Sequence, residues 1–170
     1  MIFTETTLPG AYLIDLEPHR DERGFFARTF CRREFEAHGL NPIVAQCNTS
    51  LNHQAGTLRG MHYQKAPSRE AKLVRCTRGA IHDVIVDCRS GQNFAVELTA
   101  ENRRALFVPG GFAHGFQTLL DNSEVEYQMS EYYNPDGGAG YRYDDPVLAI
   151  AWPQIVTVIS PQDLSWPAFS

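Results

Sequence analysis

Short apolar runs alternate with turn residues along most of the chain, and from residue 72 onward they recur at intervals of roughly ten. Short strands at this spacing are typical of an antiparallel sandwich or barrel. Helix signals are few, and the best is 31–40, which is about two turns long and would end at Gly39. We therefore predict an all-β fold with one or two short helices. The predicted strands fall within 11–18, 72–79, 80–91, 93–102, 104–111, 115–124 and 124–133.

The domain organisation follows from length and composition. The 170 residues suit one domain with a sizeable core, and no repeat or linker divides them, so we expect a single domain over 1–170. The stretch 144–167 holds four of the ten prolines, which favours an irregular segment wrapped over the barrel. Within this segment, 155–159 could form one strand.

Several polar residues occupy strand positions that should face the core. Because strand side chains alternate between two faces, Lys72 shares a face with Val74, and Asp83 shares one with Ile85. A small barrel can accommodate such residues by opening one end of its interior as a pocket.

The stretch LRGMHYQ (58–64) places two polar residues beside this predicted pocket. In strict alternation Arg59 and His62 would point to opposite faces of the strand. Gly60 lies between them, and glycine is where a β-bulge is least costly. We predict a bulge at Gly60 that turns both side chains inward.

Composition excludes several partners. The net charge of −5 argues against a nucleic-acid surface, which needs a basic patch. No apolar run approaches the ~20 residues that span a bilayer, and the first ten residues lack the pattern of a secretory signal. The four cysteines are scattered, which is typical of free thiols. We expect a cytoplasmic protein that binds neither nucleic acid nor membrane.

PGGFAHGF (109–116) matches the second half of the cupin signature, P-x-G-x-x-H, through Pro109, Gly111 and His114. A metal-binding cupin adds two histidines and a glutamate in the first half, whereas this chain has only His62 there. Two histidines make a poor site for zinc or iron, which usually take three protein ligands. We predict a cupin-type jelly roll without a metal or other cofactor, in which His114 orients loop or substrate groups by hydrogen bonding.

A polar pocket without a metal suits proton transfer next to a carbonyl. His62 is a candidate base, because imidazole is the side chain that titrates closest to neutral pH. Lys72 could stabilise a developing oxyanion, and Tyr127 could return a proton from the other side. Together they would catalyse an epimerisation. From the residues alone, all three could equally be ordinary strand-edge residues.

The chain resembles the dTDP-4-dehydrorhamnose 3,5-epimerase family. The resemblance implies a jelly-roll homodimer with exchanged N-terminal strands and a nucleoside-diphosphate 4-keto-6-deoxyhexose as substrate. The stretches that carry it cover nearly the whole chain in order: DERGFF (21–26), LRGMHYQ (58–64), KLVRCTRGAIHDVIVD (72–87), LTAENRRALFVPGGFAHGF (98–116), YQMSEYY (127–133), DDPVLAIAWP (144–153) and SPQD (160–163).

The resemblance also implies catalytic roles. His62 is similar to the catalytic base, Asp163 to the carboxylate that orients it, and Tyr127 to the acid on the opposite face of the sugar. Lys72 is similar to the residue near the C4 oxygen.

Further residues resemble the family's substrate contacts. Arg23 and Arg59 would contact phosphate and sugar, since an arginine fork suits a diphosphate. Gln46 and Asn48 would bind the nucleotide. The remaining correspondences are a substrate-contacting histidine at His114, a buried acid near the lysine at Asp83, and a nucleotide-stacking or pocket-wall tyrosine at Tyr133.

The chain departs from the family pattern at four positions. Arg28 replaces a glutamate among the substrate-facing residues, Cys47 an aspartate, Gly138 a glutamate and Gln162 a lysine. These changes lie around the nucleotide and the pocket rim, so they leave the nucleotide open, with dTDP as the default. The alternatives are an epimerase acting at C3 only or C5 only, a ketoisomerase, a metal-dependent oxygenase and a non-catalytic sugar-nucleotide-binding protein.

Overall fold

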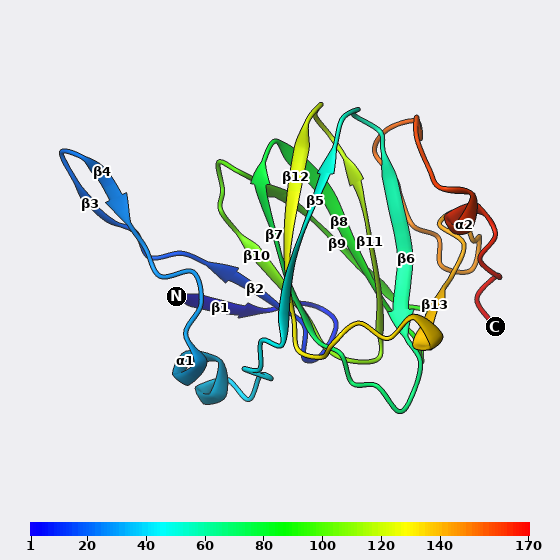
Figure 1. Cartoon of the computed structure of the whole chain (residues 1–170), viewed down its shortest axis with the longest axis horizontal. Coiled ribbons are helices and arrows are strands. Elements are labelled where there is room, and N and C mark those ends of the chain that lie inside the picture. The colour runs from blue at the N-terminus through cyan, green and yellow to red at the C-terminus, as the bar shows by residue number, and fades with distance from the viewer.

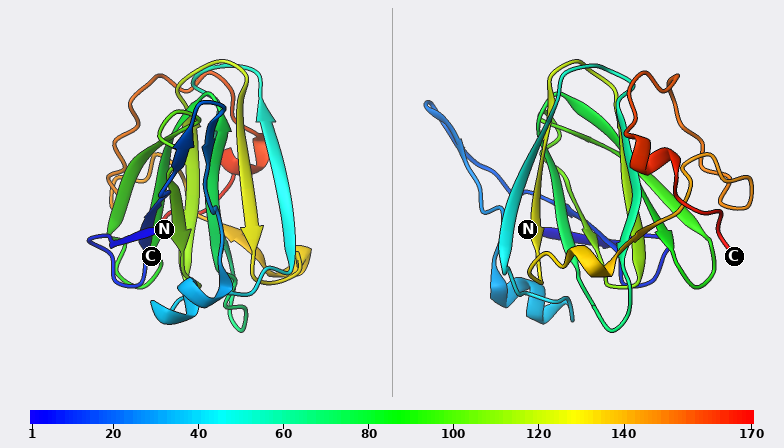
Figure 2. Two further views of the ribbon diagram at one scale, coloured as in Figure 1. Left: turned by 90° about the vertical axis from the view of Figure 1, so that its left-hand side faces the viewer. Right: turned by 45° about the vertical axis from the view of Figure 1, so that its right-hand side comes forward.

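A computed structural model describes all of residues 1–170, and two antiparallel sheets face each other in it (Figures 1 and 2). The first sheet has the order β1 (Ile2–Glu5), β2 (Tyr12–Asp15), β10 (Ala105–Val108), β7 (Lys72–Arg78), β12 (Ser123–Met129) and β5 (Gln46–Asn52). The second has the order β13 (Gly138–Gly140), β6 (Leu58–Gln64), β11 (Phe112–Thr118), β8 (Ala80–Asp87) and β9 (Asn93–Thr99). The predicted all-β jelly roll is confirmed.

The core between the sheets follows the alternation expected from the sequence. Val74 on β7 and Ile85 on β8 are fully buried in the central cluster, while Leu73 belongs to a second cluster on the outer face of the first sheet. Each buried aliphatic side chain of this kind stabilises the fold by about 1.5–3 kcal/mol relative to exposure. Helix α1 (Arg32–Ala37) covers the second cluster with Phe35. It lies within the predicted 31–40, and Gly39 follows it with a positive φ of 70°.

An N-terminal arm extends from the body. It consists of the hairpin β3 (His19–Asp21) and β4 (Gly24–Phe26), which stands away from both sheets in Figure 1. The guanidinium of Arg103 lies 4.6 Å from the ring centroid of Phe25, and the Phe26 side chain beside it is exposed.

The C-terminal segment wraps the outer side of the second sheet, as predicted (orange to red in Figure 2). A third cluster forms beneath it, in which Leu148 and Trp152 pack against Met61 and Val84. The predicted strand at 155–159 is wrong, because this stretch makes only an isolated bridge between Thr57 and Val158. Two short helical turns were not predicted, η1 (Pro135–Gly137) and α2 (Pro161–Leu164). No helix in the structure is both long and apolar enough to cross a membrane.

The predicted bulge at Gly60 is present. On β6 and β11, His62 pairs with His114 and Arg59 with Phe116, so three steps along β6 match two along β11. Gly60 has a φ of 139°, and Met61 after it is buried on the outer side of the sheet. Arg59 and His62 consequently both line the pocket between the sheets.

We expect Gly60→Ala to destabilise the protein. A Cβ at this position would lie 2.6 Å from the Cα of Gly115, and backbone cannot move aside as a flexible side chain can. The positive φ adds about 1–3 kcal/mol of strain for a residue with a Cβ. Gly24→Ala is the matched control, because Gly24 has a φ of 129° but open space around its Cβ position. In urea unfolding, equal midpoints for the two variants would contradict this expectation.

Candidate active site

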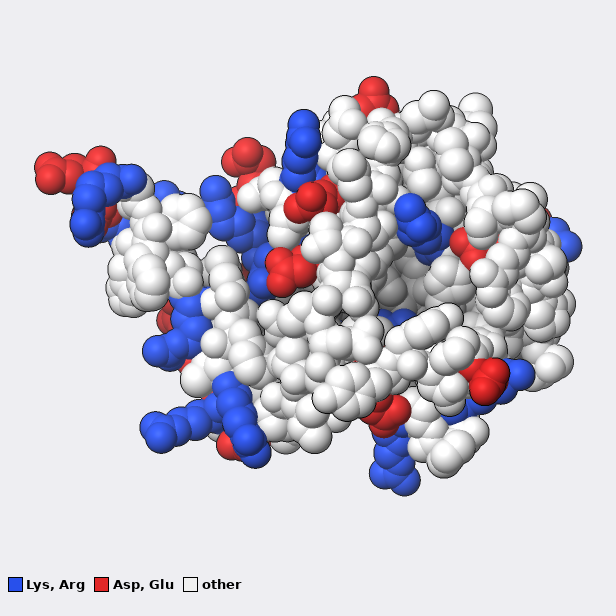
Figure 3. Space-filling model, viewed as in Figure 1, with Lys and Arg blue, Asp and Glu red and all other residues white.

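A cavity of about 300 Å³ opens between the two sheets. Figure 3 shows the surface hollowed between the β5–β12 side and β6, where few charged side chains reach the surface. The cavity is lined by Asn48, Thr49, Ser50, Arg59, His62, Lys72, His114, Phe116, Tyr127 and Met129. Six of the predicted site residues therefore meet here: Asn48, Arg59, His62, Lys72, His114 and Tyr127.

The imidazole of His62 is held by a buried carboxylate. Its Nε2 lies 2.6 Å from Oδ1 of Asp163, whose side chain is 6% exposed. Because an ionised carboxylate only accepts hydrogen bonds, Nε2 carries the hydrogen and Nδ1 is the nitrogen left to take a proton. The predicted pairing of His62 with Asp163 is thus present in the structure.

Helix α2 places Asp163. Ser160 caps the helix by accepting from the backbone N–H of Asp163 at 3.0 Å. The carboxylate also accepts from the backbone N–H of Gly60 at 3.3 Å and from Nε1–H of Trp166 at 3.2 Å. Burial alone would raise the pKa of Asp163, but the hydrogen bonds with His62, Gly60 and Trp166 outweigh it and leave the pKa below its usual value.

Tyr127 faces the cavity from the other sheet. It lies on β12, whereas His62 lies on β6, so the phenol and the imidazole approach the same space from opposite walls. Its ring packs edge-on against His114, with 6.2 Å between the ring centroids. Burial, and secondarily the charge of Asp83, raise the pKa of the Tyr127 phenol well above its ordinary value. The phenol therefore stays neutral and can donate a proton throughout the physiological range.

Lys72 lies in a nearly closed part of the wall. Its side chain is 12% exposed, and its Nζ lies 3.5 Å from Oε1 of Glu70. Asp83 is fully buried nearby, as predicted, and its Oδ1 accepts from Nε2 of His114 at 2.7 Å. Asp83 therefore contacts His114 directly and acts on Lys72 only through its charge.

A second cavity of about 290 Å³ adjoins the first, since His62, Lys72 and Met129 line both. Tyr133 and Trp166 form part of its wall, together with Gln162 and Gly138. Gln46 lies at its edge, where its Oε1 accepts from the backbone N–H of Tyr133 at 2.8 Å. Nε2 of Gln46 is 3.4 Å from Oδ1 of Asn48, so these two predicted nucleotide contacts are adjacent.

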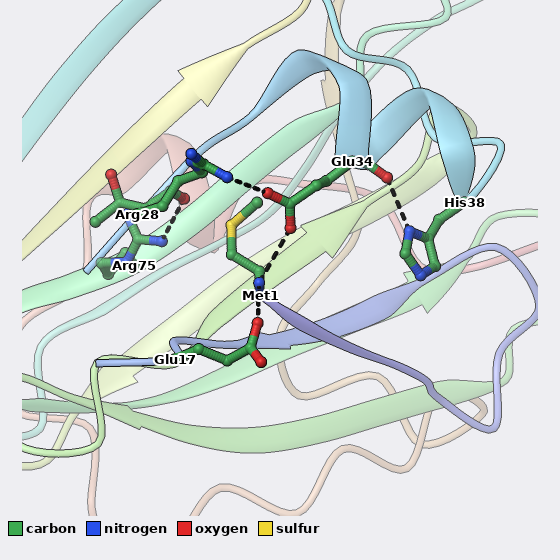
Figure 4. A network of polar contacts seen from close by, with 7 residues as sticks. Met1, Glu17, Arg28, Glu34, His38 and Arg75 are labelled. Carbon is green, nitrogen blue, oxygen red and sulfur yellow. Dashed lines mark hydrogen bonds and ion pairs between the residues drawn. The ribbon is translucent and has the colours of Figure 1, made fainter. Parts of the chain in front are cut away.

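Arg23 and Arg28 do not reach the pocket of their own chain. Arg23 lies on the projecting hairpin and pairs with Asp21. Arg28 donates to Glu34 at 2.8 Å, and Glu34 also binds the amino group of Met1 (Figure 4). Arg28 thus belongs to a network that joins the N-terminus to α1, and neither arginine lines the pocket of its own chain.

Sequence reasoning missed Asn52 and Glu70 near the site; it placed Trp166 at the pocket mouth, where it lies, but missed its hydrogen bond to Asp163. Asn52 accepts from Nε of Arg59 at 2.7 Å and so aims the guanidinium. Glu70 pairs with Lys72, and Trp166 binds the Asp163 carboxylate. The sequence did contain a signal for α2 in Ser160 and Pro161, followed by Asp163. A serine at the N-cap followed by proline typically begins a helix.

The histidines of the pocket are engaged by carboxylates. His62 pairs with Asp163 and His114 with Asp83. No group of three His, Cys, Asp or Glu side chains has a metal-binding arrangement. All four cysteines are free, and Cys47 on β5 is exposed.

The chain is similar to known proteins over nearly its whole length. The family model described as dTDP-4-dehydrorhamnose 3,5-epimerase matches residues 5–170. The dTDP-4-dehydrorhamnose 3,5-epimerase of Methanothermobacter thermautotrophicus is 41% identical, over 96% of this chain and 92% of that protein.

Two solved structures extend this similarity to the fold. The crystal structure of dTDP-4-dehydrorhamnose 3,5-epimerase from Elizabethkingia anophelis has a TM-score of 0.96 at 36% identity, covering 99% of this chain and 96% of that one. The dTDP-6-deoxy-D-glucose-3,5-epimerase of Legionella pneumophila, in complex with dTDP-4-keto-L-rhamnose, has a TM-score of 0.91 at 35% identity, covering 99% and 92%.

The jelly roll, the imidazole and phenol on opposite walls of its pocket, and the similarity to known epimerases together identify a cupin-type isomerase. The match of the family model to nearly all of the chain makes the assignment specific. The protein belongs to the dTDP-4-dehydrorhamnose 3,5-epimerase family.

Proposed function

We propose that the protein inverts C3 and C5 of a nucleoside-diphosphate 4-dehydro-6-deoxyhexose, with dTDP as the nucleotide, and needs no cofactor. The observation that carries the proposal is the placement of His62 and Tyr127 on opposite sheets across one cavity. Inversion needs a proton to leave one face of a carbon and to return on the other. The dTDP-4-keto-L-rhamnose bound by the Legionella relative is a compound of the expected class.

The reaction begins with proton removal next to the C4 ketone. Nδ1 of His62 takes the proton, and Asp163 stabilises the resulting imidazolium through its hydrogen bond to Nε2. The electron pair of the broken C–H bond moves onto the C4 oxygen as an enolate. The Lys72 ammonium at the pocket wall stabilises this charge more strongly than water would, because it is fixed in place.

The second half of the reaction returns a proton to the carbon. Tyr127 donates it from the wall opposite His62, so the carbon takes the inverted configuration and the C4 ketone forms again. The phenolate regains a proton from solvent, and His62 releases its own. The same pair acts at C3 and at C5, so no oxidant or reductant is consumed.

Contacts with the nucleotide part of the substrate supply binding energy that holds the reacting carbon in place. Arg59, held by Asn52, binds the diphosphate, and Gln46 with Asn48 binds the nucleoside. Tyr133, which is 69% exposed, stacks on the base at the rim of the second cavity. His114 contacts the sugar from β11, and Asp83 fixes its ring.

The working unit is a homodimer in the cytoplasm. The arm supports the dimer, since its hairpin projects from the body and carries the exposed ring of Phe26 together with Arg23. In a dimer the arm can reach a neighbouring pocket, which would bring Arg23 and Arg28 to a substrate. The four free thiols support a reducing compartment.

Solvent exchange tests this function directly. The purified protein, incubated in heavy water with a dTDP-4-keto-6-deoxyhexose, is expected to place deuterium at both C3 and C5 and to form the L-configured sugar. Parallel reactions with cytidine, guanosine and uridine diphosphate sugars determine the nucleotide. Deuterium at a single carbon would identify a monoepimerase, and no exchange with any of the four would refute the proposal.

A further inference from the structure

Glu70 is a buried acid next to the pocket, and the proposed chemistry gives it no role. Its side chain is 5% exposed, and its Oε1 is 3.5 Å from Nζ of Lys72. Both residues line the second cavity, so the pair borders the space in which a substrate would lie. A buried carboxylate costs several kcal/mol unless a partner compensates it. Glu70 and Lys72 therefore depend on each other for their charges.

The local structure holds Glu70 in place. Ser68 Oγ donates to Glu131 at 2.7 Å and accepts from the backbone N–H of Glu70 at 3.2 Å. Glu131 also accepts from the backbone N–H of Arg69 at 3.0 Å, and Ser130 accepts from that of Ala71 at 2.7 Å. The turn that carries Glu70 is thus tied on both sides of the residue to the end of β12. The backbone that carries Glu70 is therefore fixed, and from this position its carboxylate reaches Lys72.

Other ionisable groups also face Lys72, but each lies beyond ion-pair distance of its ammonium or carries no negative charge, and Oδ2 of Asp83, although unpaired, is no exception. Asp83 on β8 contributes a charge, yet its Oδ1 is bound to His114 on β11. His62 on β6 is bound to Asp163, Tyr127 on β12 is a neutral phenol, and Arg59 repels a cation. Glu131 after β12 is bound to the turn itself. Glu70 is the one carboxylate within ion-pair distance of Lys72.

We propose that Glu70 is a positioning residue that keeps Lys72 protonated and aimed into the pocket, and so sets the alkaline limit of the reaction. This inference rests on the proposed function for its catalytic part only. Burial lowers the pKa of Lys72, and Glu70 opposes that effect. Burial likewise raises the pKa of Glu70, with Lys72 opposing it. Without Glu70 the ammonium would be lost at a lower pH, and the C4 enolate would lose its counter-charge.

The amino-acid composition allows the titration of Lys72 to be followed directly. The chain has two lysines, Lys65 and Lys72, against thirteen arginines. Protein labelled with ¹³C at the lysine ε carbon therefore gives two titrating signals, and Lys65→Arg assigns them. Lys65 is exposed and serves as an internal reference.

The test compares Glu70→Gln with the intact protein across pH. We expect the titration midpoint of Lys72 to fall by about one pH unit or more, because the variant loses an opposite charge at ~4 Å. The titration midpoint of Lys65 should stay unchanged. The alkaline limb of kcat/KM for solvent exchange should move to lower pH by the same amount. Glu70→Asp, with a shorter side chain, should give a smaller shift. Glu126→Gln is the matched control, because it removes one charge from the outer face beside Arg75.

The outcomes separate the two proposals. An unchanged Lys72 midpoint in Glu70→Gln would overturn the inference, whatever the activity. A shifted midpoint with an unchanged alkaline limb would overturn the link between Lys72 charge and catalysis. If the intact protein catalyses no exchange, the proposed function fails, and the midpoint still decides whether Glu70 keeps Lys72 charged.

Discussion

His62→Ala is expected to reduce deuterium exchange at C3 and C5 by about 10²–10⁴-fold, the usual contribution of a positioned general base. Alanine leaves no group to receive the proton, and Asp163, although close, is a much weaker base held at the rear of the imidazole. Exchange and product formation should fall together, because proton removal precedes both. Exchange followed by mass spectrometry, and product followed by chiral analysis of the sugar, measure the two quantities in one reaction.

The matched control is His53→Ala, since His53 is exposed and lies outside both cavities. It should retain the exchange rate of the intact protein. His62→Ala should still bind the nucleotide, because Arg59, Gln46 and Asn48 are unchanged. Near-normal exchange in a folded His62→Ala protein would show that another group is the base.

Local alternation accounts for the parts of the site that the sequence could predict. The inward position of Lys72 follows from its place two residues before Val74, which the core buries completely. The bulge that turns Arg59 and His62 to one side follows from Gly60, because a one-residue shift in register moves every later side chain to the other face. Both features depend only on residues close together along the chain, so they can be predicted from one sequence alone.

The errors occur where packing overrides local pattern. A strand was expected within 115–124, but β11 is Phe112–Thr118. All seven of its residues are buried, so the alternation of apolar and polar residues that would have located it is missing. The apolar pair Leu119–Leu120 lies in the following turn, where Leu120 is 54% exposed. β5 was missed because its sequence, QCNTSLN, is polar, as suits an edge strand that faces a pocket.

Long-range contacts could not be derived from local pattern at all. Asp163 lies 101 positions after His62, and resemblance to a family, not spacing, suggested the pair. Arg23 and Arg28 illustrate the opposite case, since resemblance suggested substrate contacts and the single chain holds both away from the pocket. Under the proposed homodimer, their substrate contacts would lie in the pocket of another copy of the chain.

Two of the four departures from the family pattern lie in the wall of the second cavity, whereas Arg28 pairs with Glu34 away from it. Gly138 and Gln162 line it together with Tyr133, and Cys47 is exposed on β5 between Gln46 and Asn48. None of these residues touches the His62–Asp163 pair or Tyr127 through a hydrogen bond. We therefore expect exchanges at these positions to change the accepted substrate and to leave the acid–base pair intact.

Tyr127→Phe is expected to separate exchange from inversion. The variant keeps His62, Asp163 and Lys72, so proton removal and enolate formation continue. Without the phenol, however, the carbon regains its proton mainly from the His62 side, where the base can return deuterium taken from solvent. The sugar should therefore acquire deuterium and retain its original configuration.

We expect formation of the L-configured sugar to fall by about 10²–10⁴-fold and exchange to fall by less than about tenfold, since only the second proton transfer loses its acid. Tyr132→Phe is the control, because Tyr132 is 78% exposed and lines neither cavity. The acid assignment would be wrong if Tyr127→Phe formed the L-configured product at the normal rate. Because burial keeps the Tyr127 phenol neutral well above its ordinary range, the intact protein should also hold the ratio of inversion to exchange constant as pH rises. A ratio that fell at alkaline pH would instead point to a donor that titrates there.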